Sequence, residues 1–150
     1  MKPRIRHKNL PQLFLRARDH LMAHFRPILG HFELTDQQWR ILRALDERGE
    51  LEPRELCQLC QILSPSMAGV LLRMEEATLI QRERMPGDHR RVVVSLSKKG
   101  NQLIEEIAPL IDQQYKNIEK VIGKIEMEKL AIALDSFINT ESNLVESVHP

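Results

Sequence analysis

The sequence holds two pairs of side chains whose spacing suits metal or thiol chemistry. Cys57 and Cys60 form a C-x-x-C pair, and His20 and His24 lie one helical turn apart. A structural zinc site needs four ligands, and no second pair follows the cysteines at a matching spacing. A third ligand for the histidines could come only from residues distant in sequence, namely His7, His31 or Glu33. We therefore expect the cysteines to be small buried residues of the core, and we expect no metal and no cofactor.

Catalytic motifs are missing from the sequence. It contains no glycine-rich phosphate loop, no nucleophile elbow and no convergent pair of acids. We therefore expect that the protein is not an enzyme.

The stretch SPSMAGVLLR, which begins at Ser64, is a predicted helix with small or basic residues on one face. At 100° per residue, Ser66, Gly69, Val70 and Arg73 fall within an arc of about 100°. Small residues let a helix approach the wall of a DNA groove, Val70 can touch a thymine methyl, and Arg73 can reach a guanine edge or a phosphate. Free N–H groups near Ser64 favour phosphate. The competing interpretation is an ordinary solvated face.

The stretch RERMPGDHRR, which begins at Arg82, is a basic hairpin tip. Arg82 and Arg84 share a strand face, and Arg90 lies beside the turn, where it could enter a minor groove. We expect Asp88 to hold Arg90 in an extended rotamer rather than to bind DNA itself. The alternative is a solvated charged hairpin. The residues of the expected DNA interface, Asp88 included, are Arg54, Ser64, Pro65, Ser66, Gly69, Val70, Arg73, Arg82, Arg84, Asp88, His89, Arg90 and Arg91.

Two helices are predicted at the start of the chain. Apolar residues recur at three- and four-residue spacing over residues 9–29, where Pro27 should kink the last turn. Thr35 and Gln38 form a capping box for the next helix, which Gly49 closes.

Two further helices follow closely on one another. One begins near Pro53 and runs to Leu63; the next is capped by Ser64 and has Pro65 at its first position. The buried stripe of the second helix consists of Met67, Leu71 and Met74. Two short helices joined this tightly form a helix-turn-helix.

The periodicity changes to that of a β-hairpin over residues 80–96. Ser97 then caps a long helix that reaches Ile125, in which Pro109 predicts a bend or a break, and a last helix covers residues 130–144. Helix, helix and hairpin in this order form a winged helix. We therefore expect a mainly α fold with a small β-hairpin wing, that is, a winged helix-turn-helix plus a helical dimerisation region.

The terminal helices carry more apolar positions than one small winged domain can cover. We expect one domain over residues 1–150, with a DNA-binding core at about 33–97 and dimerisation helices at about 5–30 and 100–148. The alternative is that these helices wrap their own core. The expected dimer residues are Leu10, Leu13, Val121, Ile122, Leu130, Leu134, Phe137 and Ile138.

Charge is distributed unevenly along the chain, although the net charge is only +1. Basic and acidic residues number 8 and 3 in residues 1–40 but 4 and 9 in residues 101–150. This asymmetry suits a protein that presents one surface to a polyanion. With 42% hydrophobic and 29% charged residues, no spanning apolar run and no signal-peptide pattern, we expect a folded cytoplasmic protein.

The segments LTDQQWRILRAL, ILSPSMAGVLLRME and DHRRVVVSLSKKG, at their spacing here, resemble the MarR family of dimeric winged-helix transcription regulators. The most specific element is the run that starts at Asp88 and ends with the Lys99-Gly100 pair. FRPIL, QQWRILRAL, GELE and PSMAGVL are similar to the repressors of 4-hydroxyphenylacetate (homoprotocatechuate) catabolic operons. The resemblance implies a homodimer on a pseudo-palindromic double-stranded operator, with the helix over 64–79 in the major groove and the wing in the flanking minor groove. It also implies release by an aromatic acid.

Candidate ligand-binding residues lie on the first two helices. Arg16 and His20 are one turn apart, His24 lies within the apolar stripe, and Trp39 and Arg40 are on the next helix. An arginine beside an aromatic wall suits a carboxylate-bearing ring. The resemblance implies a pocket between the dimer helices and the reading domain. Alternatively, Trp39 belongs to the core and Arg16 to a structural ion pair.

We therefore expect a DNA-binding repressor that an aromatic carboxylate releases from its operator. One alternative is a metal- or thiol-responsive regulator of the same fold, acting through Cys57 or His24. The other is a winged-helix adaptor that binds protein, against which the basic wing argues.

Overall fold

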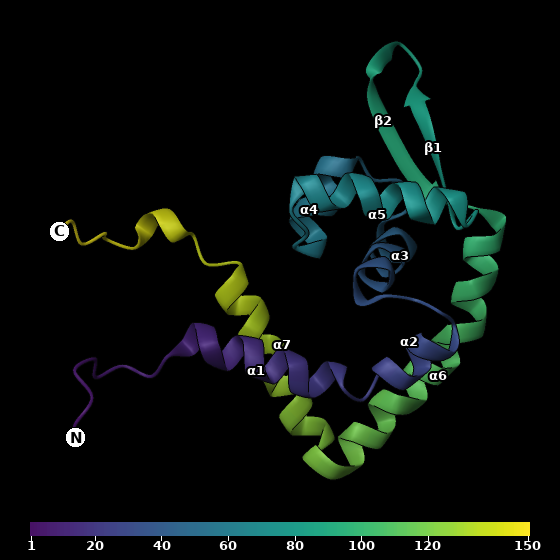
Figure 1. Ribbon diagram of the computed structural model, residues 1–150. Coiled ribbons are helices and arrows are strands. Elements are labelled where there is room, and N and C mark those ends of the chain that lie inside the picture. The colour runs from purple at the N-terminus through teal and green to yellow at the C-terminus, as the bar shows by residue number, and fades with distance from the viewer. The chain divides into compact units, whose positions relative to one another are not determined.

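The computed structural model describes residues 1–150 and is mainly helical, with one two-stranded antiparallel hairpin (Figure 1). This confirms the predicted fold class. The elements are α1 (Leu10–Met22), α2 (Arg26–His31), α3 (Asp36–Arg48), α4 (Pro53–Cys60), α5 (Ser64–Glu76), β1 (Ile80–Met85), β2 (Asp88–Leu96), α6 (Lys98–Ile122), α7 (Lys124–Ile138) and a 3-10 turn at Ser142–Leu144. The chain forms two compact units, residues 1–111 and 112–150, whose boundary falls within α6.

The first predicted helix is two helices in the structure. α1 ends at Met22, and α2 begins at Arg26, so that Pro27 stands in the first turn of α2. A proline is tolerated there because the first N–H groups of a helix have no intrahelical partner. The chain therefore breaks before Pro27 instead of kinking at the end of one long helix. α1 buries no residue, whereas Phe25 and Leu29 are in the core.

α3 begins and ends as its sequence predicts. The hydroxyl of Thr35 accepts a hydrogen bond from the Gln38 backbone N–H at 3.1 Å, and the Gln38 side chain accepts one from the Thr35 N–H at 3.1 Å. Gly49 follows the last turn with φ +81°, a conformation that favours glycine. The buried face of the helix consists of Ile41, Leu42 and Leu45.

The turn between α4 and α5 differs from the prediction. α4 ends at Cys60 and not at Leu63, because Gln61 adopts the left-handed conformation with φ 52°. The chain then bends, so that α4 and α5 lie at 109° to one another. α5 begins at Ser64 itself, with Leu63 at the capping position and no side-chain cap, so the predicted Ser64 cap was wrong.

The hairpin has the predicted bounds. Ile80 pairs with Leu96 and Arg82 with Val94, and the turn falls at Pro86 and Gly87. Leu51 and Val94 exchange backbone hydrogen bonds of 3.0 and 2.7 Å, which fixes the base of β2 to the segment before α4. The hairpin projects beyond α5 on the side away from α3 (Figure 1).

The long helix α6 is capped as predicted but ends early. The hydroxyl of Ser97 accepts a hydrogen bond from the Gly100 N–H at 2.9 Å. The helix continues through Pro109, so of the predicted bend or break, a break is absent. The helix stops before Gly123, whose φ is +107°. Ile125 therefore belongs to α7, and Leu144 to the 3-10 turn.

No single helix has the length and apolar composition needed to cross a membrane. α4 and α5 meet that criterion only when they are taken together, despite the bend between them.

Candidate nucleic-acid interface and ligand pocket

The outward face of α5 carries most of the predicted groove-facing residues. Ser64, Pro65, Ser66 and Arg73 are exposed, and Gly69 is half-buried. Val70 is only 2% exposed, so its placement on this face was wrong.

The reason for the Val70 error lies in helical phase. If Ser66 is set at 0°, Val70 falls at 40°, next to Met74 at 80° and Met67 at 100°. Both methionines are buried, so Val70 is at the edge of the apolar stripe and packs in the core. The exposed arc is centred instead on Pro65 and Gly69.

The side chain of Arg73 lies next to Gly69. A Cβ built on Gly69 would lie 3.4 Å from Nη1 and 4.0 Å from Nη2 of Arg73. The guanidinium therefore folds back along the helix and covers the glycine. This geometry holds an arginine flat against the surface of α5 that faces away from the core.

Two arginines of the wing are ion-paired to the helices beside it. Arg82 contacts Glu75 of α5 through Nε and Nη2, each at 3.2 Å. Arg91 contacts Glu52, the capping residue of α4. These pairs fix the wing relative to the helix-turn-helix and partly neutralise the two arginines.

The tip of the wing is held by hydrogen bonds to its backbone. Arg84 donates from Nη1 to the carbonyl oxygen of His89 at 3.1 Å. The Asp88 carboxylate accepts a hydrogen bond from the backbone N–H of Arg90 at 3.1 Å. We had expected Asp88 to hold the Arg90 guanidinium. Its carboxylate instead binds the Arg90 backbone and orders the turn.

Three arginines of the interface form neither an ion pair nor a side-chain hydrogen bond. Arg54 is exposed on the first turn of α4, Arg73 on α5 and Arg90 at the wing tip. His89 is also exposed at the tip. Because these arginines belong to three elements, they offer separate positive charges to a large anionic surface.

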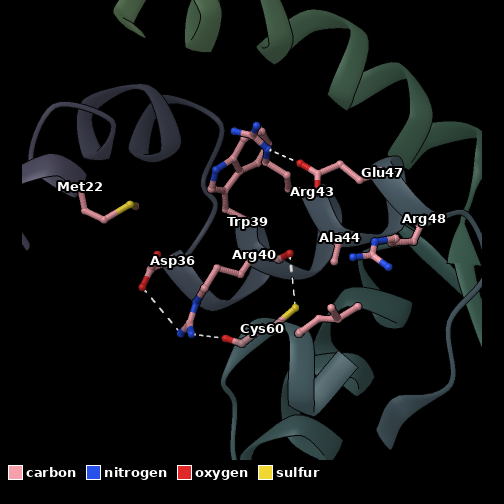
Figure 2. Close-up of a pocket in the computed structure, with 10 residues that line it drawn as sticks. Met22, Asp36, Trp39, Arg40, Arg43, Ala44, Glu47, Arg48 and Cys60 are labelled. Carbon is pink, nitrogen blue, oxygen red and sulfur yellow. Dashed lines mark hydrogen bonds and ion pairs between the residues drawn. The ribbon is translucent and has the colours of Figure 1, made fainter. Parts of the chain in front are cut away.

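A cavity of about 270 Å³ lies beside the helix-turn-helix (Figure 2). Its walls come from α1, α3 and α4. The lining residues are Met22, Asp36, Trp39, Arg40, Arg43, Ala44, Glu47, Arg48, Leu59 and Cys60. The structure thus brings Trp39 and Arg40 to one site.

Arg16 and His20 do not reach this cavity. They line a separate depression on α1 with Leu13, and His24 lines neither site. The reason is again helical phase: with Arg18 at 0°, Met22 falls at 40°, whereas Arg16 and His20 fall on the opposite side of α1. Arg18, and not Arg16, forms the ion pair with Asp36.

Arg43 is a pocket residue that the sequence interpretation missed. It lies one helical turn after Trp39 on α3, and its Nε is 2.9 Å from the Glu47 carboxylate. Arg40, the predicted cation, instead donates its Nη1 to backbone carbonyl oxygens of Cys60 and Gln61. The four-residue spacing of Trp39 and Arg43 was the available signal.

The comparisons with known proteins identify the family. Residues 32–91 match the MarR family. Over 144 residues the chain is 39% identical to the HTH-type transcriptional regulator FarR of Neisseria gonorrhoeae, an alignment that covers 96% of this chain and 99% of FarR. It is 34% identical to the homoprotocatechuate degradative operon repressor of Escherichia coli over 95% of this chain and 96% of that protein. The chain belongs to the MarR family.

Solved structures of MarR-like regulators share the fold. NadR in complex with 4-hydroxyphenylacetate matches with a TM-score of 0.84 and 39% identity, over 94% of this chain and 100% of NadR. The transcriptional regulator PA4135 matches with a TM-score of 0.88 and 35% identity, over 90% of this chain and 99% of PA4135. MarR-family proteins are transcription regulators that bind operator DNA and are not enzymes, so the fold and family predictions are confirmed.

The MarR-type terminal helices expose many apolar side chains. Among the expected dimer residues, Leu134 is half-buried and the other seven are exposed, from 41% for Leu13 to 87% for Val121. Residues 112–150 by themselves cover few of their apolar positions.

The cysteine pair lies on α4, next to the pocket. Cys60 is buried, and its Sγ lies 3.5 Å from the Arg40 carbonyl oxygen; Cys57 is half-buried. Burial raises the pKa of the Cys60 thiol, although the nearby Arg40 charge opposes the shift. The prediction that both cysteines are buried is right for Cys60 and wrong for Cys57. Leu56 beside them is buried, whereas Leu59 and Leu63 are exposed. The structure contains no cluster of three metal-ligating side chains; His20 and His24 contact one another edge to face.

Proposed function

We propose that this MarR-family protein represses an operon for the degradation of an aromatic acid, and that a phenolic carboxylate such as 4-hydroxyphenylacetate releases it from the operator. The observation that carries the proposal is the cavity beside the helix-turn-helix, which holds the only tryptophan of the chain and an arginine one turn away. Two relatives support it: one is named for the homoprotocatechuate operon, and NadR was solved with 4-hydroxyphenylacetate.

The cavity suits a small aromatic acid. A volume of about 270 Å³ is close to the lower end of small-molecule sites, about 300 Å³, so it fits one ring and not a larger cofactor. The Trp39 indole and Met22 supply apolar walls, and Arg43 supplies a guanidinium for a carboxylate. Arg16, His20 and His24 have no part in this proposal, because they do not line the cavity.

On the DNA side, we propose a homodimer that places two copies of α5 in successive major grooves. The exposed apolar side chains of α1, α6 and α7 support dimerisation, since such surface is otherwise left in water. The wing would follow the flanking minor groove, with Arg90 at its tip. Arg54, Arg73 and Arg90 would contact DNA directly, whereas Arg82 and Arg91 would hold the wing in place. Such a protein would work in the cytoplasm, where the operator is.

The test is a DNA-shift assay on the DNA upstream of the chain's own gene, titrated with phenylacetates, benzoates and cinnamates. We expect a retarded complex that hydroxylated phenylacetates dissociate at lower concentration than benzoates or cinnamates. The change in Trp39 fluorescence should follow the same concentration order. Dissociation of the complex by zinc or peroxide, and by none of the acids, would contradict the proposal.

A further inference from the structure

A chain of polar contacts runs from α1 across the pocket wall to the turn between α4 and α5. Arg18 donates from Nη2 to both carboxylate oxygens of Asp36, each at 2.9 Å. The same carboxylate lies 3.7 Å from Nη2 of Arg40. Figure 2 shows Arg40 between Asp36 on one side and the Cys60 carbonyl group on the other.

Arg40 closes the last turn of α4. Its Nη1 donates to the carbonyl oxygen of Cys60, and it lies 3.3 Å from that of Gln61. The last carbonyl groups of a helix have no intrahelical partner, and a cation stabilises them. Because Gln61 is left-handed and α5 starts three residues later, this contact helps to fix the angle at which α5 leaves the turn.

The same arginine borders the cavity. Asp36, Arg40 and Cys60 all line the cavity. A ligand in it therefore lies beside Arg40 and beside both residues that Arg40 contacts, Asp36 and Cys60. The Nε of Arg40 is buried and has no hydrogen-bond partner, which leaves the guanidinium with one unsatisfied donor. The Arg40 side chain as a whole is 26% exposed and lines the cavity, so an anion there offers the guanidinium a partner that competes with the carbonyl groups of the turn.

We propose that Arg40 is a positioning residue that couples occupancy of the cavity to the orientation of α5. This inference rests on the proposed function and extends it by naming the connection between ligand and DNA. A carboxylate in the cavity attracts the guanidinium, the contacts with Cys60 and Gln61 weaken, and the turn no longer holds α5 at one angle. A ligand shifts this equilibrium only as far as its affinities for the two arrangements differ.

The experiment measures ligand binding and DNA binding separately in four proteins: the wild type, Arg40→Met, Arg40→Lys and Arg48→Met. Calorimetry gives the affinity for 4-hydroxyphenylacetate, and fluorescence anisotropy gives the affinity for the upstream duplex with and without saturating ligand. In the wild type we expect the ligand to weaken DNA binding by about 5- to 150-fold, the usual range of such coupling. Both Arg40 variants should still bind the ligand, but Arg40→Met should reduce the coupling to less than about twofold.

Arg40→Lys protects the test against a misfolded Arg40→Met protein. Lysine keeps the charge, but one ammonium group cannot reproduce the planar fork that contacts both Asp36 and the turn. We expect the coupling in Arg40→Lys to lie between that of the wild type and that of Arg40→Met. Arg48 lies two turns further along α3 and lines the same cavity, but it forms no ion pair and does not contact the turn after α4. Arg48→Met therefore controls for the loss of a positive charge beside the ligand: we expect a lower ligand affinity, but wild-type coupling at saturating ligand.

Wild-type coupling in both Arg40 variants, or an equal loss in Arg48→Met, would overturn the role of Arg40 while leaving the proposed function intact. A wild-type protein that binds the duplex but not 4-hydroxyphenylacetate would overturn the proposed effector, and this inference with it. The wild-type titration alone distinguishes these two failures.

Discussion

The arginines of the proposed DNA interface differ in whether an acidic side chain already holds them. Arg73 and Arg90 form no ion pair, whereas Arg82 is held by Glu75. We expect Arg90→Ala to weaken binding to all sequences alike and to reduce the salt slope by about 1, as the loss of one phosphate contact does. Arg73→Ala should cost about 1–3 kcal/mol and also relax the preference at one base pair. Binding measured across a set of operator variants separates the two; equal, sequence-independent losses would contradict these roles.

Gly69→Ala tests the packing of Arg73 on α5. Alanine is favoured over glycine inside a helix by about 1 kcal/mol, so the free energy of unfolding should rise. The new Cβ would lie 3.4 Å from Nη1, an ordinary contact distance, so the guanidinium can keep its place and DNA affinity should be unchanged. Chemical denaturation and anisotropy measure the two effects. A more stable variant with clearly weaker DNA binding would show that the alanine displaces Arg73 or meets the DNA itself.

The sequence predicted only some of the residues of the candidate ligand pocket and DNA interface. Trp39 was found because an aromatic residue near an arginine is a local pattern. Arg40 was assigned to the ligand because nothing in the sequence shows that its guanidinium reaches the carbonyl groups of Cys60 and Gln61, twenty residues away. Val70 was misplaced because it lies at the boundary of the apolar stripe, where only packing decides between core and surface.

At the scale of elements, the joint between the wing and α6 depends on one glycine. A Cβ on Gly100 would lie 2.1 Å from the Leu79 carbonyl oxygen, a backbone atom that cannot move aside. We expect Gly100→Ala to lower the free energy of unfolding by at least about 2 kcal/mol. Gly30→Ala is the matched control, because nothing lies within 4 Å of its Cβ and the site is helical, so stability should rise by up to about 1 kcal/mol. Similar melting curves for the two variants would contradict this account of the joint.

Elements with a local signal were predicted well. The capping box of α3, the hairpin and the Ser97 cap of α6 each depend on residues a few positions apart. The start of α2, the end of α4 and the start of α5 were not predicted. Gln61 takes a left-handed conformation without being glycine; Arg40 of α3 contacts its carbonyl oxygen, and the next residue of the turn, Ile62, is buried in the core. Such tertiary contacts override local preference.

At the scale of the whole molecule, the proposal requires a dimer. Ile138 is 71% exposed on α7, and a charge there would be buried in the expected interface. Ile138→Glu should shift the protein toward the monomer in analytical ultracentrifugation and weaken operator binding at least tenfold. Val148→Glu is the control: Val148 is 94% exposed but lies beyond the last helix, so it should keep the wild-type mass. A dimeric Ile138→Glu protein would place the interface elsewhere.

The central claim is that two copies of the chain hold one duplex through α5 and the wing. The most direct measurement is a titration of the protein against the upstream duplex at about 50 and 200 mM salt, with the stoichiometry read from the equivalence point. The account predicts two chains per site and, if at least six phosphates are contacted, a loss of affinity of about 10³-fold or more between the two salt concentrations. One chain per duplex, or an affinity that salt does not change, would contradict it.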